Sequence, residues 1–140
     1  MIGVVIVSHS NIASEFVSVL EHIVGKQENI AAISIFPDDN VEKKRKEIIK
    51  AIKKVDQKKG VIVLTDMFGG TPSNLAISVM DEEKVEVVAG VNLPMLIKIS
   101  SLRNKCKIKE LIKISQESGR KYMNVASAFF GETTNCNKKN

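Results

Sequence analysis

The N-terminal stretch of the chain reads Ile2-Gly3-Val4-Val5-Ile6-Val7-Ser8-His9-Ser10-Asn11. Its apolar run, from Ile2 to Val7, has the length and residue types of a buried strand. The run stops at a polar turn, and an amphipathic helical pattern begins directly after it. A strand that enters a helix in this way places His9 at its carboxyl end, which is where open α/β sheets keep their active sites.

The same alternation of strands and helices continues along the rest of the chain. Further strands are expected at Ile30 to Phe36, Val61 to Leu64, Val85 to Ala89 and, with a weaker pattern, Val125 to Phe130. The first helix is expected at Ile12 to Val24, with Gly25 as its end, and a second from the capping pair Asp39 and Glu42 to Lys59-Gly60. A further helix is expected to begin at Pro94, and another at Ile108 to Glu117, with Gly119 as its end. Short connections between alternating elements predict right-handed crossovers, and therefore a three-layer α/β/α fold with a mostly parallel central sheet.

The length and composition limit the classes of protein to which the chain can belong. A chain of 140 residues is expected to form one domain, over residues 1–130, with a polar tail at 131–140. The hydrophobic share of 44% is that of a globular protein, and the longest apolar runs are too short to cross a bilayer. No signal peptide is recognisable, so the chain is expected to be cytoplasmic. Cys106 and Cys136 lack partners at metal-ligand spacing, which predicts free thiols and no metal site.

The net charge of +5 arises largely from one basic run around the second expected helix. Its cations are Lys43, Lys44, Arg45, Lys46, Lys50, Lys53, Lys54, Lys58 and Lys59. Such a run can meet an acidic partner or nucleic acid, but no aromatic residues interleave with it to stack on bases. Lysines outnumber arginines 18 to 3, whereas phosphate recognition in nucleic acids favours the planar fork of arginine. A solvated helix face is the favoured interpretation, and no nucleic-acid partner is expected.

A second polar segment, Asp66-Met67-Phe68-Gly69-Gly70-Thr71-Pro72-Ser73-Asn74, follows the strand expected at Val61 to Leu64. Thr71-Pro72 is typical of an N-cap followed by proline at the first helical position, and the two glycines allow a tight turn. Free amides and the positive end of the helix dipole then favour an anion such as a phosphoryl group. On its own the segment is also compatible with a simple strand-to-helix connection.

The expected sheet brings His9 and Asp66 to one edge. An imidazole attacks phosphorus through an unprotonated nitrogen, and a carboxylate bonded to the opposite ring N–H fixes the tautomer. Asp66 is the candidate for that carboxylate, while Thr71, Ser73 and the amides of Gly69, Gly70 and Thr71 are candidate phosphoryl-binding groups. The alternatives remain open that Asp66 caps a local turn and that His9 is an ordinary turn histidine. The other histidine, His22, lies off the apolar stripe of its helix and is expected on the surface.

At these residues the chain resembles a known family, the IIA component of the mannose class of the bacterial phosphoenolpyruvate-dependent sugar phosphotransferase system. The resemblance runs nearly end to end. It rests on Val4 to Ser10, on the segment Asp66 to Asn74, and on Ala89-Gly90-Val91-Asn92-Leu93-Pro94-Met95-Leu96.

The resemblance implies that His9 accepts a phosphoryl group from the carrier HPr and passes it to a IIB component. It further implies that Asp66 orients the ring so that Nε2 is the nucleophile, that Thr71 helps to hold the phosphoryl group, and that no cofactor is needed. Family members are usually dimers that exchange a C-terminal strand, for which Val125 to Phe130 is the candidate. The expected pocket-shaping residues around this site are Ser8, Ser10, Phe68, Asn92 and Pro94.

The chain departs from the family pattern at two places. The family more often has Thr-His-Gly where this chain has Ser8-His9-Ser10, and Trp-Gly-Gly where it has Phe68-Gly69-Gly70. Ser-His-Ser is common in a relative, the phosphotransfer subunit of dihydroxyacetone kinase, which is one alternative function. A second alternative is a regulatory module whose binding to another protein depends on phosphorylation of His9. In the favoured interpretation the IIB partner is a separate chain, and membrane contact is indirect, through IIC and IID components.

Overall fold

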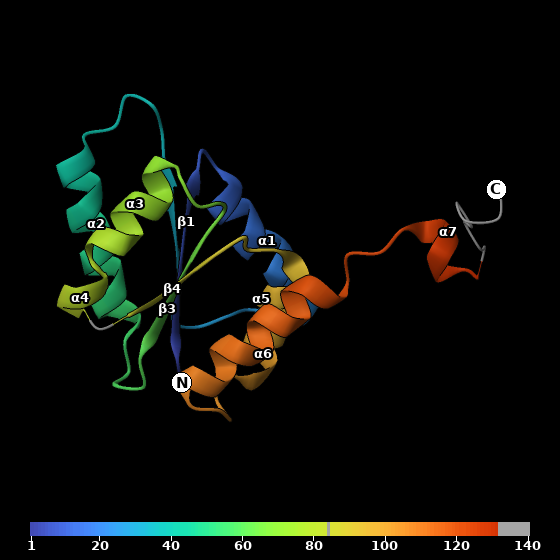
Figure 1. Cartoon of the computed structure of the whole chain (residues 1–140). Helices are drawn as coiled ribbons and strands as arrows, with labels where there is room; N and C mark the ends of the chain where they lie inside the picture. The colour runs from blue at the N-terminus through green and yellow to red at the C-terminus, as the bar shows by residue number, and fades with distance from the viewer. Residues whose placement is uncertain (84, 132–140) are drawn as a thin grey trace.

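The computed structural model describes residues 1–83 and 85–131 and is built around one parallel sheet (Figure 1). The strands are β1 Gly3–His9, β2 Ile30–Ile35, β3 Val61–Thr65 and β4 Glu86–Ala89, in the order β2-β1-β3-β4. All three pairings in this sheet are parallel, which confirms the predicted α/β class. The continuous apolar run of β1 follows from its central position, because a strand buried on both faces needs no polar alternation.

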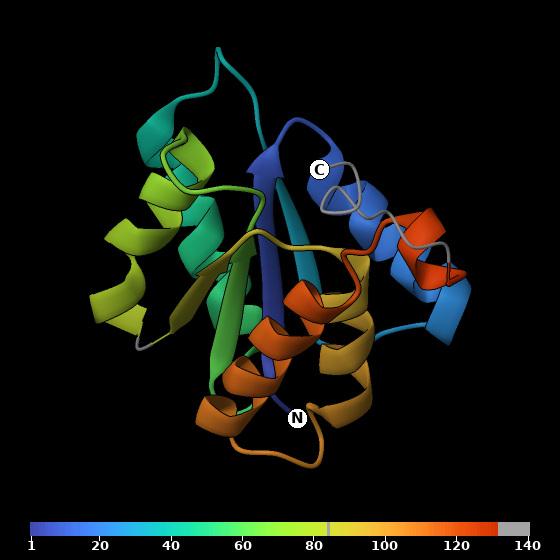
Figure 2. The ribbon, with the colours of Figure 1, turned by 45° about the vertical axis from the view of Figure 1, so that its right-hand side comes forward.

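Helices cover both faces of the sheet, as Figures 1 and 2 show. They are α1 Ile12–Val24, α2 Val41–Val55, α3 Thr71–Ser78, α4 Met80–Glu83, α5 Leu93–Leu102, α6 Ile108–Lys121 and α7 Ala126–Phe129. One core cluster joins α2 and α3 to the face of β1 that carries Val5 and Val7. The other joins α1, α5 and α6 to the face that carries Val4 and Ile6. The predicted three-layer arrangement is therefore confirmed.

The strand order fixes where a site can lie. From β1 the chain crosses over by way of α1 to β2 on one side, and then by way of α2 to β3 on the other side of β1. Successive connections therefore diverge between β1 and β3, at the topological switch point where α/β sheets form a crevice. Val7 pairs with Thr65 across this boundary, so the residues that follow these two partners, including His9 and Asp66, emerge at the same edge.

The predicted end of the last long helix at Gly119 is wrong, because α6 continues to Lys121. A Cβ at Gly119 would lie 3.0 Å from the terminal methyl of Met95 and 3.5 Å from Oδ1 of Asn92. The Asn92 side chain also donates a hydrogen bond of 2.8 Å to the Gly119 carbonyl. This glycine therefore permits the close approach of α6 to α5 instead of ending the helix.

The cap of the basic helix also differs from the prediction by one residue. The N-cap of α2 is Asn40, whose side chain accepts a hydrogen bond from the N–H of Lys43. Asp39 instead accepts from the N–H of Phe36 at 2.7 Å, which holds the turn that precedes the helix. Asp39 thus stabilises the turn, and its neighbour Asn40 caps the helix.

The strand predicted at Val125 to Phe130 is wrong for the single chain, which forms the short helix α7 there. This segment extends away from the rest of the fold (Figure 1), and Met123, Phe129 and Phe130 are exposed. Without a strand partner, its backbone groups bond locally, from the N–H of Phe130 to the carbonyl of Ala126 for example. Apart from Gly131, the predicted tail at 131–140 lies outside the described residues.

His22 and Cys106 lie in the surroundings that the sequence predicts for them. His22 is exposed, as expected, and Cys106 is a free thiol, whereas Cys136 lies outside the described residues. Within residues 1–83 and 85–131, no helix combines the length and apolar character needed to cross a bilayer.

Candidate active site

The turn that carries His9 is anchored from beneath by Ser8, which is fully buried. The Ser8 hydroxyl accepts a hydrogen bond of 2.7 Å from the N–H of Ala13 in α1. It can donate to the carbonyl of His9 or of Ser10, at 3.1 and 3.3 Å. Because the N-cap residue Asn11 offers no side-chain bond, Ser8 satisfies the helix start from inside the sheet. Ser8 thereby fixes the position of the His9 turn.

Ser10 has a backbone φ of 49°, in the left-handed region. Its N–H donates to the carbonyl of Ile35 at 2.8 Å, which ties the turn to the end of β2. A glycine adopts this conformation without the steric cost that a Cβ brings. The departure from Thr-His-Gly noted above therefore falls at a position where the backbone favours glycine.

We expect Ser10→Gly to raise the free energy of unfolding by about 0.5 to 1 kcal/mol, since relief of the left-handed strain exceeds the added chain entropy. Ser14 in α1 is a matched control, because glycine there should lower the free energy of unfolding by about 0.5 kcal/mol. Urea unfolding of both variants checks this. A Ser10→Gly variant as destabilised as Ser14→Gly would contradict a strained turn.

Asp66 holds His9 through both its backbone and its ring. The carboxylate oxygen Oδ2 accepts from the backbone N–H of His9 at 2.9 Å and lies 2.8 Å from ring Nδ1. The other oxygen, Oδ1, accepts from the N–H of Met67 at 2.9 Å. In the neutral ring this geometry places the hydrogen on Nδ1 and leaves the lone pair on Nε2. The two interpretations of Asp66 left open by the sequence are thus combined, since it both braces a local turn and orients the imidazole.

Burial acts to raise the pKa of Asp66, but hydrogen bonds from the backbone and ring of His9, the attraction of the imidazolium and the N–H of Met67 together lower the pKa below 3.8. The carboxylate is therefore charged at neutral pH. A negative charge at Nδ1 stabilises the positive ring that forms when Nε2 gains a substituent.

The lowered pKa of Asp66 predicts a pH dependence of stability. Its stabilising contribution should be complete above the unfolded value of about 3.8 and be lost as the pH falls through the lower, folded pKa. Denaturant unfolding of the wild-type protein and of Asp66→Asn across this acidic range checks the prediction. The stability difference between them should shrink on acidification, and a constant difference would contradict it.

Gly70 lies against the far side of the His9 ring. A Cβ at this position would lie 2.6 Å from Cε1 and 2.9 Å from Nε2. The backbone there is extended, with φ of −113° and ψ of 171°, so any residue could adopt it. Gly70 is therefore required by the space that the ring needs and not by its own backbone.

We expect Gly70→Ala to keep the fold but to displace the ring, so that the phosphorylation of His9 that the family resemblance implies should be slower by about tenfold or more. Gly69→Ala is the matched control, because Gly69 has φ of 89° with nothing within 4 Å of an added Cβ. That variant should lose stability without crowding the ring. Phosphorylation rates and urea unfolding of both variants separate the two effects, and equal rates in Gly70→Ala and wild type would refute the crowding.

The loop at the start of α3 differs in detail from the predicted cap. Gly70, not Thr71, is the N-cap, and Thr71 and Pro72 are the first helical residues. Ser73 is fully buried, and its hydroxyl accepts from the N–H of Gly69 at 3.1 Å and donates to the carbonyl of Gly70 at 3.0 Å. Ser73 and the Gly69 amide, both predicted to bind phosphoryl oxygens, are thus engaged within the loop.

Two kinds of donor remain free beside the ring. The exposed hydroxyl of Thr71 has no partner among the described residues, and neither do the N–H groups of Gly70 and Thr71. The positive end of the α3 dipole adds to these groups. Together they favour an oxyanion next to Nε2.

A groove of about 440 Å³ opens beside the ring and is lined by His9, Ser10, Thr71, Asp39 and Lys44, among others. The ammonium of Lys44 lies 3.0 Å from a carboxylate oxygen of Glu47 and 3.9 Å from one of Asp39. Sequence reasoning missed Lys44 because it lies within a run of lysines and nothing in the pattern distinguishes it. Only the packing of α2 against β1 brings it to this edge.

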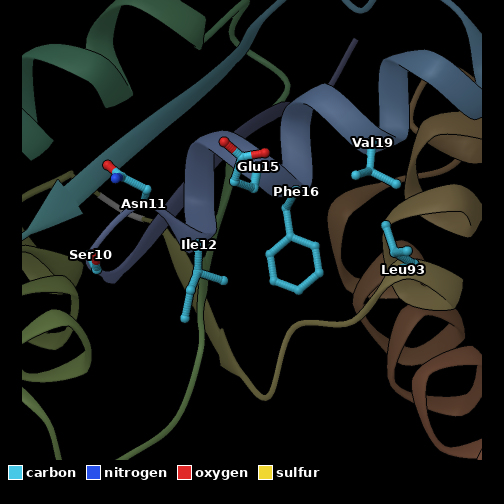
Figure 3. A pocket seen from close by; sticks show the side chains of 7 residues that line it. All are labelled: Ser10, Asn11, Ile12, Glu15, Phe16, Val19 and Leu93. Atoms are coloured by element: carbon cyan, nitrogen blue, oxygen red, sulfur yellow. The ribbon is translucent and has the colours of Figure 1, made fainter.

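A second, apolar groove of about 410 Å³ begins on the other side of Ser10. Figure 3 shows Ile12, Phe16 and Val19 of α1 along it, with Leu93 of α5 opposite. The helical stripe of α1 was predicted from the sequence. The sequence did not predict that part of this stripe would remain uncovered beside the His9 turn.

Four of the predicted pocket-shaping residues do not line these two grooves, and one of them is Ser8, which lies buried beneath the turn. Phe68 is 61% exposed in the loop before Gly69. Asn92 caps α5 by accepting from the N–H of Met95 at 3.0 Å, and Pro94 lies in the first turn of that helix. Within the described parts of the chain, no three His, Cys, Asp or Glu side chains are grouped so as to hold a metal ion.

Comparison with known proteins places this chain in a family. Residues 3–116 match the family model EIIA-man, described as "PTS system fructose IIA component". The chain belongs to the IIA family of the sugar phosphotransferase system (PTS). This confirms the resemblance found in the sequence.

Individual relatives of the IIA chain agree with the family. It is 36% identical over 121 residues to the PTS system mannose-specific EIIAB component of Escherichia coli (strain K12), covering 85% of the chain and 38% of that relative. It is 27% identical over 139 residues to the PTS system fructose-specific EIIA component of Bacillus subtilis (strain 168), covering 99% of the chain and 95% of that relative. The crystal structure of phosphotransferase system component EIIA from Streptococcus agalactiae superposes with a TM-score of 0.84 at 28% identity, covering 91% and 99% of the two chains.

Proposed function

We propose that this IIA chain is a phosphocarrier, in which Nε2 of His9 accepts a phosphoryl group from the phosphohistidine of HPr and passes it to a IIB component. The observation that carries the proposal is the bond of 2.8 Å between Nδ1 of His9 and Asp66, which leaves Nε2 as the free nitrogen of a ring that is 47% exposed. Family membership makes the chain a component of a phosphotransferase system.

In the first step the lone pair of Nε2 attacks phosphorus while the P–N bond to HPr breaks, and that electron pair returns to the HPr ring. The His9 ring then carries hydrogen on Nδ1, the phosphoryl group on Nε2 and a positive charge, which the Asp66 carboxylate stabilises. The Thr71 hydroxyl and the free amides at the start of α3 are placed to meet the charge on the phosphoryl oxygens. In the second step a nucleophile of the IIB component attacks, and the electron pair of the P–N bond returns to Nε2.

We also propose the location, oligomeric state and partners of the protein from its family membership. The protein acts in the cytoplasm as a homodimer and passes the phosphoryl group to a IIB component, and it reaches the membrane only through IIC and IID components. The exposed aromatic side chains of Phe129 and Phe130 support association, because apolar groups of this size gain by burial. The relatives are named for three sugars, mannose, fructose and sorbose.

The test is phosphorylation of the intact protein by phosphoenolpyruvate, enzyme I and HPr, followed by mass spectrometry. We expect a mass gain of one phosphoryl group that requires HPr, is labile in acid, and maps to the peptide that contains His9. Subsequent loss of the group on addition of a IIB component would complete the transfer. No mass gain with an HPr that phosphorylates another IIA protein would overturn the proposal, and a gain with no transfer to any IIB component would favour a regulatory role.

A further inference from the structure

A pocket of about 480 Å³ lies at the end of the sheet opposite to His9. Two segments far apart in the sequence bring lysines to it: Lys58 and Lys59 from the turn before β3, and Lys105 and Lys107 from the connection between α5 and α6. Figure 2 shows this connection next to the N-terminus, at the lower end of the molecule, away from the tip of β1. We call this feature, defined by the four lysines, the basal pocket.

The charge of the basal pocket is not balanced by its own lining. No aspartate or glutamate lines it, and none of its four lysines forms an ion pair among the described residues. The nearby Asp56 carboxylate accepts from the backbone N–H of Lys58 at 2.8 Å and caps that turn. Concentrated positive charge without counter-charges favours an anionic occupant.

Arg103 also lines the basal pocket but serves the fold. Its guanidinium, on a residue that is only 3% exposed, donates hydrogen bonds to the carbonyl oxygens of Glu28 and Asn29. Burial lowers the pKa of Arg103, although attraction to Glu28 opposes this effect. Arg103 thus ties α5 to the start of β2 and forms a rigid wall, and the four lysines supply the free cations.

One backbone feature adds to the case for an anion site. The 14-residue helix α6 begins at the pocket, and its N-cap, Lys107, makes no side-chain capping bond. The unsatisfied N–H groups and positive dipole of that helix start therefore act in the same direction as the lysines.

We propose that the basal pocket binds a small anion that carries two phosphate groups. Its volume lies in the range of small-molecule sites, which is about 300 to 1,000 Å³. The lysines come as two pairs on separate segments, which suits two phosphate groups better than one. No aromatic side chain lines the pocket, so stacking on a nucleobase does not contribute, while Ile2 and Ile108 offer an apolar surface to a short carbon chain. The proposal is independent of phosphoryl transfer at His9.

Titration calorimetry with pyrophosphate and with fructose bisphosphate tests the proposal and distinguishes an inorganic from an organic ligand. The pocket variant is Lys105→Gln/Lys107→Gln, and the matched control is Lys43→Gln/Lys46→Gln, which removes the same charge from exposed positions of α2. We expect saturable binding to the wild-type protein, affinity at least about tenfold lower in the pocket variant, and unchanged affinity in the control.

Cys106 provides a second measurement, because its half-buried thiol lines the basal pocket. In a Cys136→Ser background, saturating ligand should slow alkylation of Cys106 by iodoacetamide. The proposal is overturned if neither probe binds more tightly than about 1 mM, if both double variants lose affinity equally, or if bound ligand leaves the alkylation rate unchanged. Binding that survives in the pocket variant would instead place the anion elsewhere, for example at the start of α3.

Discussion

His9→Gln is expected to take up no phosphoryl group, although its fold should be unchanged. Glutamine fills a similar volume and can still receive the Asp66 contacts through its backbone N–H and side-chain amide, but it has no ring nitrogen with a lone pair to attack phosphorus. The measurement is the mass gain with phosphoenolpyruvate, enzyme I and HPr. Wild-type protein should gain one phosphoryl group, and the variant none.

The second histidine offers a matched control for this result. The ring of His22 is exposed on α1 and makes no hydrogen bond in the described parts of the chain, so His22→Gln should be phosphorylated like the wild type. Thermal unfolding of both variants verifies that they are folded. A mass gain that persists in His9→Gln and disappears in His22→Gln would transfer the acceptor role to the other histidine.

Asp66→Asn is expected to slow phosphorylation of His9 by roughly 10³-fold, because loss of the orienting carboxylate in a histidine-based site costs up to about 10⁴-fold. The amide keeps the size of the side chain but removes the charge that stabilises the positive ring. It also allows the other tautomer, in which an Asn N–H donates to Nδ1 and the ring hydrogen occupies Nε2. The nucleophilic lone pair is then lost.

Asp38→Asn is the control for charge, since Asp38 is exposed in the turn before α2. Its phosphorylation rate should match that of the wild type. Single-turnover rates at saturating phospho-HPr separate the chemical step from docking, and ring-nitrogen chemical shifts of His9 report the tautomer directly. Equal rates in Asp66→Asn and the wild type would show that Asp66 has no part in the mechanism. Its role would then be limited to stabilising the local turn through the N–H of Met67.

The elements that depend on local pattern were predicted well from the sequence. The helix at Ile12 to Val24 has the predicted bounds, and the strands of the sheet differ from the prediction by one or two residues at their ends. The helix α2 ends at Val55, earlier than the predicted end at Lys59-Gly60. The pairing of His9 with Asp66 was inferable because parallel strands carry their carboxyl ends to one edge, so two polar turns after two buried runs meet there. Periodicity and chain direction were enough for both conclusions.

The features that depend on a neighbouring element were not predictable. Gly119 carries the usual signal for a helix end, yet its role is set by Asn92 and Met95 of another helix. The segment at Val125 to Phe130 has the composition of a strand, but a strand forms only where a sheet edge receives it. Ser73 was assigned to the ligand because sequence cannot show that its hydroxyl is used within the loop.

The contact between His9 and Asp66 has a consequence for the order in which the protein gains activity. The two residues are 57 positions apart, and between them lie α1, β2, α2 and β3. No fragment that lacks the β1–β3 pairing can hold the imidazole ready for attack. Under the proposed function, the capacity to accept a phosphoryl group therefore marks completed closure of the sheet, and pulses of phospho-HPr during refolding are expected to label only those molecules in which this closure has occurred.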